Sequence, residues 1–358
     1  MTDLRGELPP RTAGRLLVLL ASFEHSRGIM RAVVVESPGA PSKVVELAKP
    51  VPGKGEVLVR IAASGVNPLD TKIRAGAAAH ARHPLPATLG LDLAGTVESI
   101  GDEVTGFSPG DAVYGMTGGV GGVQGTLAEF AAVDARLLAP KPRRLSMKQS
   151  AAIALVFITA WEGLVDRAAI RPGRSVLVQG GAGGVGHMAI QIARSVGSTV
   201  YATASAGKRS VVERLGATFI DYNTVGVDDY VAQHTGGSGF DVVFDCCGGA
   251  VLDASFKAVS RHGHVVSALG WGTHLLAPLS FKAASYSGIF TLYPLLSGVG
   301  REHHGQILRE ATRLADSGKL APIVDSREFT LETVDSAYEA LLHGSVNGKL
   351  VVDVAMPG

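Results

Sequence analysis

The sequence has little cysteine, no long apolar run and no excess of charge of one sign, and each shortage excludes a class of protein. Only two of its 358 residues are cysteines, Cys246 and Cys247, which adjoin in the chain. A disulfide framework or a cysteine-rich zinc site needs more than two neighbouring thiols, so the composition favours a reducing, cytoplasmic compartment. The formal net charge is +1 without a block of one sign. The sequence therefore offers no electrostatic footprint for nucleic acid or for an anionic membrane.

No apolar run reaches the ~18–20 residues that a membrane-spanning helix requires. The stretch RLLVLLASF at 15–23 has only a faint signal-peptide pattern, because it is short and lacks a small-x-small cleavage site. A strand that closes in a turn, MRAVVVESPG, begins at Met30. We therefore expect residues 1–29 to be an extension outside the folded core, preceding a second start at Met30.

Apolar residues are plentiful, at 46% against 18% charged, and glycine accounts for 46 of the 358 residues. This glycine content, about 13% against a usual ~7%, predicts many tight turns and close backbone approaches. The length and the apolar content together indicate a globular chain of two domains.

The pattern of elements changes once along the chain. Residues 30–151 contain short strands between Gly and Pro, which is typical of an all-β, barrel-like unit. The stretch 148–168, KQSAAIALVFITAWEGLVDRA, then predicts one buried helix. From 152 to 288, buried strands alternate with amphipathic helices, which is the pattern of a doubly wound parallel sheet. We expect 289–358 to return to the first unit.

One stretch, SVLVQGGAGGVGHMAIQIAR at 175–194, carries a G-x-G-x-x-G motif at Gly181, Gly183 and Gly186. A buried strand precedes the motif and an amphipathic helix follows it, which is the context of a dinucleotide-binding turn. We expect the first glycine to permit the tight turn, the second to let the backbone approach a pyrophosphate, and the third to let helix and strand pack closely. Free amides at the helix start then favour the phosphate charge. A simple strand-to-helix turn is the alternative.

A second glycine-rich stretch, GGVGGVQG at 118–125, lacks this context because it opens no helix. It lies between two strand-like segments, so we expect a flexible β loop over a site.

The cofactor expected at the motif is NADPH. An NAD site usually places Asp or Glu about 20 residues after the glycines, for the ribose hydroxyls, yet no acid occurs from Thr199 to Arg209. Ser205, Lys208 and Arg209 are available there for a 2′-phosphate. The alternative is that Lys208 and Arg209 are simply exposed at the start of the next helix. Cys247 follows a later strand, where we expect it to border the cofactor.

No metal site is expected. His80 and His83, with Asp92 nearby, and the pair His303 and His304 are the candidates that the sequence offers. Neither group completes a set of zinc ligands. We therefore expect the chemistry to need no metal.

Segments spread over nearly the whole chain carry a resemblance to a known family. In order they are GVNPLDTKIRAG, LGLDLAGTVESIG, GDAVYGM, ITAWEGL, GGAGGVG and NGKLVVDV. From about Met30 to Val354 the chain resembles the zinc-independent quinone oxidoreductases of the medium-chain dehydrogenase/reductase superfamily. Where zinc-dependent relatives carry a cysteine the chain has Asn67, and where they carry a His–Glu pair it has Leu91-Asp92.

This resemblance implies an α/β fold with a GroES-like β domain and an inserted Rossmann domain built on a doubly wound parallel sheet. It places the first part of the GroES-like catalytic domain at 30–151 and the NADP-binding Rossmann domain at 152–288. Residues 289–358 would return to the catalytic domain. NADPH, a small-molecule quinone or enone substrate and a second copy of the chain, in a homodimer, are the implied partners.

The resemblance also implies site residues. Asn67 would face the nicotinamide and the substrate, and Thr159 would bond the nicotinamide amide. The implied cofactor-binding residues are Gly181, Gly183, Gly184, Val185, Gly186, Ser205, Lys208, Arg209, Cys247, Leu269, Gly270 and Lys349. Asn67 is also a good turn former before Pro68, and a capping or packing role within a buried helix is the alternative for Thr159.

The function indicated is NADPH-dependent, metal-independent reduction of quinones or related activated double bonds by direct hydride transfer. An enoyl or enone reductase is one alternative. Some of those enzymes place a donor tyrosine shortly after NPxD, where AGAAAHARHPL at 75–85 has none. A cofactor-binding sensor or structural protein without turnover is the other alternative.

Overall fold

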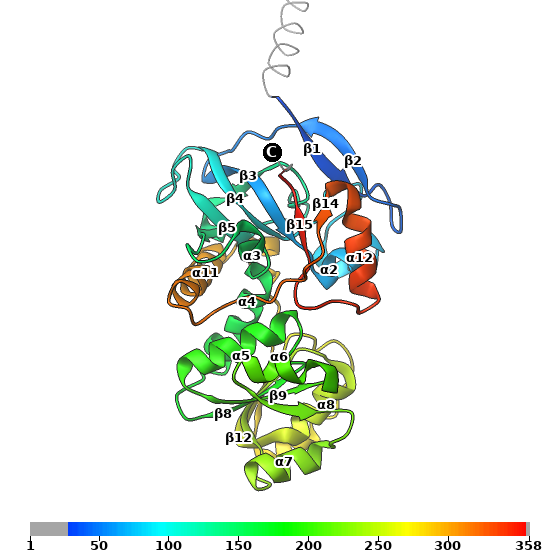
Figure 1. The fold of residues 1–358 in the computed structure, drawn as a ribbon, viewed down its shortest axis with the longest axis vertical. Helices are drawn as coiled ribbons and strands as arrows, with labels where there is room; N and C mark the ends of the chain where they lie inside the picture. Colours follow the sequence, from blue (N-terminus) through cyan, green and yellow to red (C-terminus); the bar gives the residue numbers. More distant parts are fainter. Residues whose placement is uncertain (1–27, 356–358) are drawn as a thin grey trace, which may run out of the picture.

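The structure, a computed structural model, describes residues 28–355. The expected extension at 1–29 lies outside the described residues except for Gly28 and Ile29. Figure 1 shows two parts along the long axis of the molecule: a β-rich part that holds both the blue and the red segments, and a green-to-yellow part around a second sheet. Within 28–355, no helix has both the length and the apolar character needed to cross a bilayer.

The β-rich part is built mainly from antiparallel strands. It contains β1 (Ile29–Val34), β2 (Lys43–Ala48), β3 (Glu56–Gly65), β4 (Asp92–Ile100), β5 (Ala112–Met116), β6 (Phe130–Asp134), β7 (Leu138–Pro140), β14 (Phe329–Thr330) and β15 (Val351–Asp353). A seven-stranded sheet has the order β14-β15-β3-β4-β5-β7 with β6 paired to β3, and β1 and β2 form a separate pair. Burial along β6 alternates, with Ala131 and Val133 inside, as the two-residue period of a strand on a core requires.

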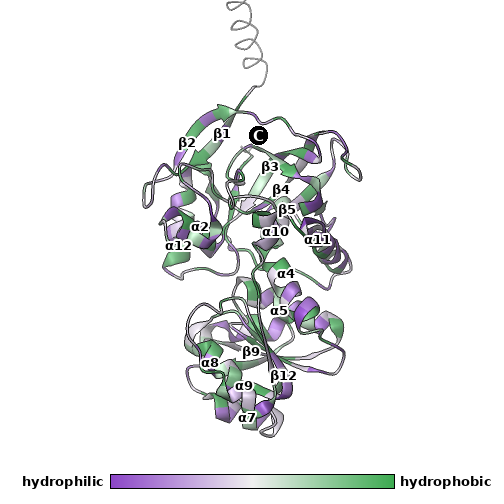
Figure 2. Ribbon diagram, turned by 180° about the vertical axis from the view of Figure 1, so that it is seen from behind, coloured by the Kyte–Doolittle hydropathy of each residue, from purple (hydrophilic) through white to green (hydrophobic). Residues whose placement is uncertain are grey.

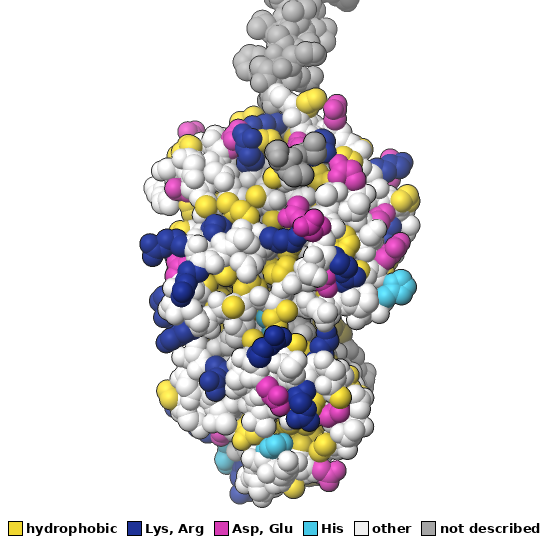
Figure 3. Space-filling model, viewed as in Figure 1, with side chains coloured by type: hydrophobic (Ala, Val, Ile, Leu, Met, Phe, Trp, Pro, Cys, Tyr) yellow, Lys and Arg dark blue, Asp and Glu magenta, His cyan; other side chains and the backbone are white. Residues whose placement is uncertain are grey.

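Short helices surround this sheet. They are α2 (Pro68–Arg74), η1 (Ala79–Ala81), η2 (Ala135–Leu137), α3 (Met147–Ala151), α10 (Tyr293–Ser297), α11 (Arg301–Asp316), η5 (Leu331–Thr333) and α12 (Val334–Leu342). Figure 2 shows purple, hydrophilic residues on α11, whose other face packs its apolar side chains on the core. On the face drawn in Figure 3, basic and acidic side chains are interspersed.

The second part is a six-stranded parallel sheet with helices on both sides. Its strands are β8 (Ser175–Gln179), β9 (Thr199–Ala204), β10 (Thr218–Asp221), β11 (Phe240–Asp245), β12 (Val259–Ser267) and β13 (Ser285–Gly288). Its helices are α5 (Gly184–Val196), η4 (Ala206–Lys208), α6 (Arg209–Arg214), α7 (Val227–Thr235), α8 (Gly249–Ala258) and α9 (Ala277–Lys282). The strand order β10-β9-β8-β11-β12-β13 is the 3-2-1-4-5-6 order of a doubly wound dinucleotide-binding sheet. The predicted α/β fold class is confirmed.

The single buried helix predicted over 148–168 is interrupted. The structure has α3, then α4 (Ala154–Trp161), then the π-helical segment η3 (Glu162–Arg167). The backbone N–H of Leu155, in the first turn of α4, donates to Oδ1 of Asp92 at 3.0 Å, which ties the start of α4 to β4. Local sequence carries no sign of this long-range bond.

The last strand returns to the first part and pairs with β3. In this antiparallel pairing Val351 lies opposite Gly65 and Val352 lies opposite Ser64. The pairing brings Lys349, just before β15, beside Val66 and therefore next to the start of α2.

Candidate active site

A cavity of about 950 Å³ lies between the two parts, at the carboxyl ends of β8, β9 and β11. Such crevices are where doubly wound sheets bind ligands. The predicted residues that line it are Asn67, Thr159, Gly183, Gly184, Val185, Gly186, Ser205, Lys208, Cys247, Leu269 and Lys349. Gly181, Arg209 and Gly270 lie outside its lining.

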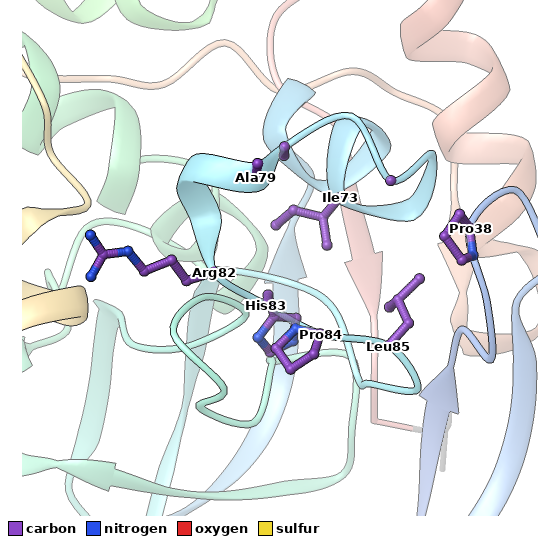
Figure 4. Close-up of a pocket in the computed structure, with 9 residues that line it drawn as sticks. Pro38, Ile73, Ala79, Arg82, His83, Pro84 and Leu85 are labelled. Carbon is purple, nitrogen blue, oxygen red and sulfur yellow. The ribbon is translucent and has the colours of Figure 1, made fainter.

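A smaller cavity, of about 510 Å³, lies on the other side of the segment 77–85 (Figure 4). Ala78 and Ala79 line this smaller cavity, whereas Ala77 and His80 line the larger one. This short segment therefore borders both cavities, and its residues Ala78 and Ala81 belong to the core.

The glycine turn follows β8 and begins at Gly180. Gly180 has φ +77°, a left-handed conformation that favours glycine. The expectation that Gly181 permits the tight turn is wrong, because a Cβ at Gly181 would instead come within 2.5 Å of Ala202 on the neighbouring β9. At Gly186 a Cβ would lie 2.2 Å from the carbonyl oxygen of Gly180, so the third glycine does allow the close packing predicted for it.

The start of α5 is open toward the cavity and fits a pyrophosphate. The N-cap residue of α5 is Gly183, so no side-chain hydrogen bond caps the start of this helix. A Cβ at Gly183 would meet only Gly180 O, at 3.3 Å, so the space above Gly183 belongs to the cavity. A Cβ at the first helical residue, Gly184, would instead meet Cδ of Lys349 at 3.3 Å and Cγ1 of Val156 at 3.5 Å. The first amides of a helix have no acceptor within it, and with the helix dipole they favour an anion.

The basic residues after β9 occupy different places. Lys208 lines the cavity together with Ser205, and its ammonium donates to the side-chain oxygen of Asn347. The guanidinium of Arg209 instead lies over the ring of Phe219, 4.3 Å from its centroid. Of the two basic residues, only Lys208 lines this cavity.

Asn67 and Lys349 form a buried pair at the cavity wall. The ammonium of Lys349 donates to Oδ1 of Asn67 and, at 2.8 Å, to Val66 O. Nδ2 of Asn67 donates to Oδ2 of Asp92 at 2.9 Å and to Gly65 O at 3.4 Å. Both ends of the Asn67 amide are thus used inside the protein, which fixes its orientation and leaves Lys349 as the polar group with a free N–H.

Two buried carboxyls that the sequence analysis did not assign complete this network. Oδ2 of Asp70 accepts the backbone N–H of Asn67 at 2.8 Å, and Asp92 accepts from Asn67 and Leu155. Burial raises the pKa of Asp70 to about 7 and that of Asp92 to about 6, although the Lys349 ammonium opposes both shifts. Burial also lowers the pKa of Lys349. The N-x-x-D spacing of a helix cap was the available signal for Asp70.

Thr159 has one hydrogen-bonding face inside its helix and one toward the cavity. Its hydroxyl donates to Leu155 O at 2.8 Å and lies 3.1 Å from Oγ1 of Thr291. Thr291 donates to Oε2 of Glu162 at 3.0 Å, and Oε1 of Glu162 lies 3.2 Å from Nε2 of His304. This chain of contacts orients Thr159. No sequence motif indicates the part that Thr291 plays in it.

The cysteines follow β11 and lie beside the glycine turn. Cys247 lines the cavity, and a Cβ on Gly180 would lie 2.8 Å from its sulfur. Burial raises the pKa of the Cys247 thiol to about 11. The thiol therefore stays protonated and is a poor nucleophile.

The histidine pairs are engaged in other contacts. His303 bonds to Asp166 at 2.7 Å, and the ring of His80 packs against Trp271 at a tilt of 34°. Among residues 28–355, no three His, Cys, Asp or Glu side chains come together as ligands. Asn67, where the resembling zinc enzymes carry a cysteine, bonds to Asp92, and Leu91 stands where they carry a histidine, so the donor set does not fit zinc.

The expectation of a flexible loop over the site at 118–125 is wrong. None of its residues lines the larger cavity. A Cβ at Gly125 would lie 2.2 Å from Leu89 O, and one at Gly119 would lie 2.4 Å from Gly90 O. The glycines there serve close backbone packing within the β-rich part.

Comparison with known proteins agrees with this geometry. Residues 53–143 match the family described as "Alcohol dehydrogenase GroES-like domain", and residues 215–352 match "Zinc-binding dehydrogenase". The chain is 32% identical to "Quinone oxidoreductase" of Homo sapiens, covering 90% of this chain and 98% of the relative. It is 34% identical to "NADPH-dependent alkenal/one oxidoreductase, chloroplastic" of Arabidopsis thaliana, over 83% and 72%.

A solved structure is closer. An alcohol dehydrogenase superfamily protein from Novosphingobium aromaticivorans shares 58% identity and superposes with a TM-score of 0.90, covering 91% of this chain and all of that one. Fold and site define an oxidoreductase enzyme with the medium-chain dehydrogenase/reductase architecture. Within that superfamily, the chain belongs to the quinone oxidoreductase family.

The buried carboxyl of Asp92 predicts a pH-dependent stability. Its folded-state pKa, about 6, exceeds its ordinary value of 3.8. Protonated Asp92 therefore stabilises the folded state. This stabilisation is fully present below pH ~4 and is lost as the pH rises through about 6. In the Asp92→Asn variant this side chain is uncharged at every pH of the experiment. Relative to this variant, the wild type should lose about 2–3 kcal/mol of unfolding free energy between pH 4 and 7.

Urea unfolding of both proteins across this range measures the difference. Asp102→Asn, which alters an exposed carboxylate, should follow the wild type in parallel. Parallel curves for Asp92→Asn as well would show that Asp92 is not buried as described.

Proposed function

We propose that this chain is an NADPH-dependent, metal-independent reductase of quinones or related activated double bonds. The observation that carries the proposal is a single cavity that joins the open start of α5, the Asn67–Lys349 pair and a largely apolar wall. The helix start suits a pyrophosphate, and the apolar wall suits an uncharged acceptor. When bound, NADPH supplies a hydride, so the protein has to hold and orient the reactants and exclude water.

The proposed contacts divide the cofactor among three groups of residues. The amides of Gly183 to Gly186 hold the pyrophosphate. Ser205 and Lys208 hold the 2′-phosphate, and Cys247 and Leu269 border the ribose. Oγ1 of Thr159, which already donates to Leu155 O, accepts from the carboxamide.

The buried network supplies a proton in this proposal. Asn67 holds Lys349 in place through its Oδ1, and Asp92 holds Asn67 from the other side. A lysine whose pKa is lowered by burial is a more effective acid near neutral pH than an exposed one. Lys349 would then give a proton to the oxygen anion formed on the reduced acceptor.

The direct test is NADPH oxidation by a panel of quinones and enones, with and without a chelator. Turnover should occur and should be unchanged by EDTA, a chelator without an aromatic ring. Loss of activity with the chelator would contradict metal independence. Tight NADPH binding without turnover by any acceptor would instead favour a sensor.

Lys208→Glu tests the choice of cofactor. Replacing the 2′-phosphate contact by a repulsion should raise the KM for NADPH by roughly 10- to 100-fold, the range of a lost charged hydrogen bond. The KM for NADH should change by less than about 3-fold. Arg209→Glu is the matched control and should have a much smaller effect, since Arg209 lies over Phe219. Equal effects of Lys208→Glu on both nucleotides would refute the assignment.

The proposed homodimer uses the free edge of the parallel sheet. β13 is its outermost strand and pairs only with β12. Within β13 Tyr286 is 39% exposed, and Leu275, just before α9, is 73% exposed. An open edge with apolar neighbours favours pairing with a second copy. Sedimentation velocity should give twice the 36.9 kDa mass of one chain. A species with the mass of one chain would contradict the dimer.

A further inference from the structure

Three aromatic rings from distant parts of the chain meet at the wall of the larger cavity. His80 lies in η1, Trp271 follows β12, and Phe290 follows β13. The ring centroids of His80 and Trp271 are 5.0 Å apart, and those of Trp271 and Phe290 are 6.0 Å apart at 81°. All three residues line the cavity. The rings therefore close one end of the site from both parts of the molecule.

The indole of Trp271 is left largely uncovered in this cluster. Trp271 is 55% exposed and Phe290 is 38% exposed. His80 packs beside the indole at 34°, and Phe290 meets it edge to face. Large aromatic surface facing a cavity is unsatisfied apolar surface, and a flat π-system is the partner that covers it best.

The segment 77–85 that carries His80 is held by the core. Ala78 and Ala81 are 8% and 0% exposed and belong to the main hydrophobic cluster, and the carbonyl oxygen of Ala81 accepts the backbone N–H of Gly121 at 2.9 Å. His80 therefore meets Trp271 from a fixed backbone, so the aromatic cluster is formed before a ligand enters.

We propose that His80, Trp271 and Phe290 form an aromatic subsite that selects acceptors with a planar aromatic ring fused or conjugated to the reducible double bond. The inference rests on the proposed function and names its substrate class. Each aromatic contact contributes about 0.5–1.5 kcal/mol beyond area burial, equivalent to roughly 2- to 10-fold in affinity.

Matched acceptor pairs test this selectivity. They are 1,4-naphthoquinone against 1,4-benzoquinone, and 4-phenyl-3-buten-2-one against 3-penten-2-one. Trp271→Ala and His80→Ala should each lower kcat/KM for the ring-bearing member about 5- to 10-fold more than for its partner, mainly through KM. His80→Phe should retain the preference. Phe281→Ala, which removes an exposed ring outside the cavity, should leave the ratio unchanged.

Fluorescence gives a readout without cofactor or turnover. The chain has two tryptophans, Trp161 and Trp271, and 1,4-naphthoquinone should quench Trp271 with saturation after correction for absorption. His80→Ala should raise the half-saturating concentration about 3-fold or more, and Trp271→Phe should abolish the saturable part. If Trp271→Ala and His80→Ala turn over both acceptors with the wild-type ratio of kcat/KM, the aromatic subsite is refuted and the proposed function stands. Saturable quenching by Trp271 without NADPH oxidation by any acceptor overturns the proposed function and leaves the ring-binding subsite standing.

Discussion

The antiparallel pairing of β15 with β3 is the constraint on which the site depends. It places the ammonium of Lys349 against Val66 and Asn67, 283 and 282 residues earlier in the chain. Burying a lysine is unfavourable unless it is paired and hydrogen-bonded. The carbonyl of Val66 and Oδ1 of Asn67 accept its hydrogen bonds, and the nearby carboxyls of Asp70 and Asp92 favour its charge. The polar wall of the cavity is thus a consequence of strand pairing in the β-rich part.

Most of the fold could be predicted from local patterns. The apolar residues of β11 predict that both its faces are buried, and the amphipathic pattern of α5 predicts that one of its faces is. The glycine motif became informative because a strand precedes it and a helix follows. The second glycine-rich stretch shows the limit of composition: its glycines allow backbones to approach within the β-rich part. From the sequence alone, glycines required for close backbone packing look the same as glycines in a loop above a ligand.

The rest of the candidate site depends on contacts that only the folded chain makes. Asp92 lies within a strand, and its role follows from an amide 63 residues later. Thr291 reaches Thr159 across 132 residues. Lys208 and Arg209 are neighbours in sequence, yet the change from η4 to α6 turns one toward the cavity and the other over Phe219. Charge and spacing alone make the two equivalent.

The interleaving of the two parts sets an order on their assembly during synthesis. The six strands from Ser175 to Gly288 are contiguous, so the parallel sheet can form while later residues are still being added. The seven-stranded sheet lacks β15, one neighbour of β3, until Asp353 has been synthesised. The glycine turn and the sheet that carries it can therefore be in place before Lys349, which completes the opposite wall of the cavity, has been added.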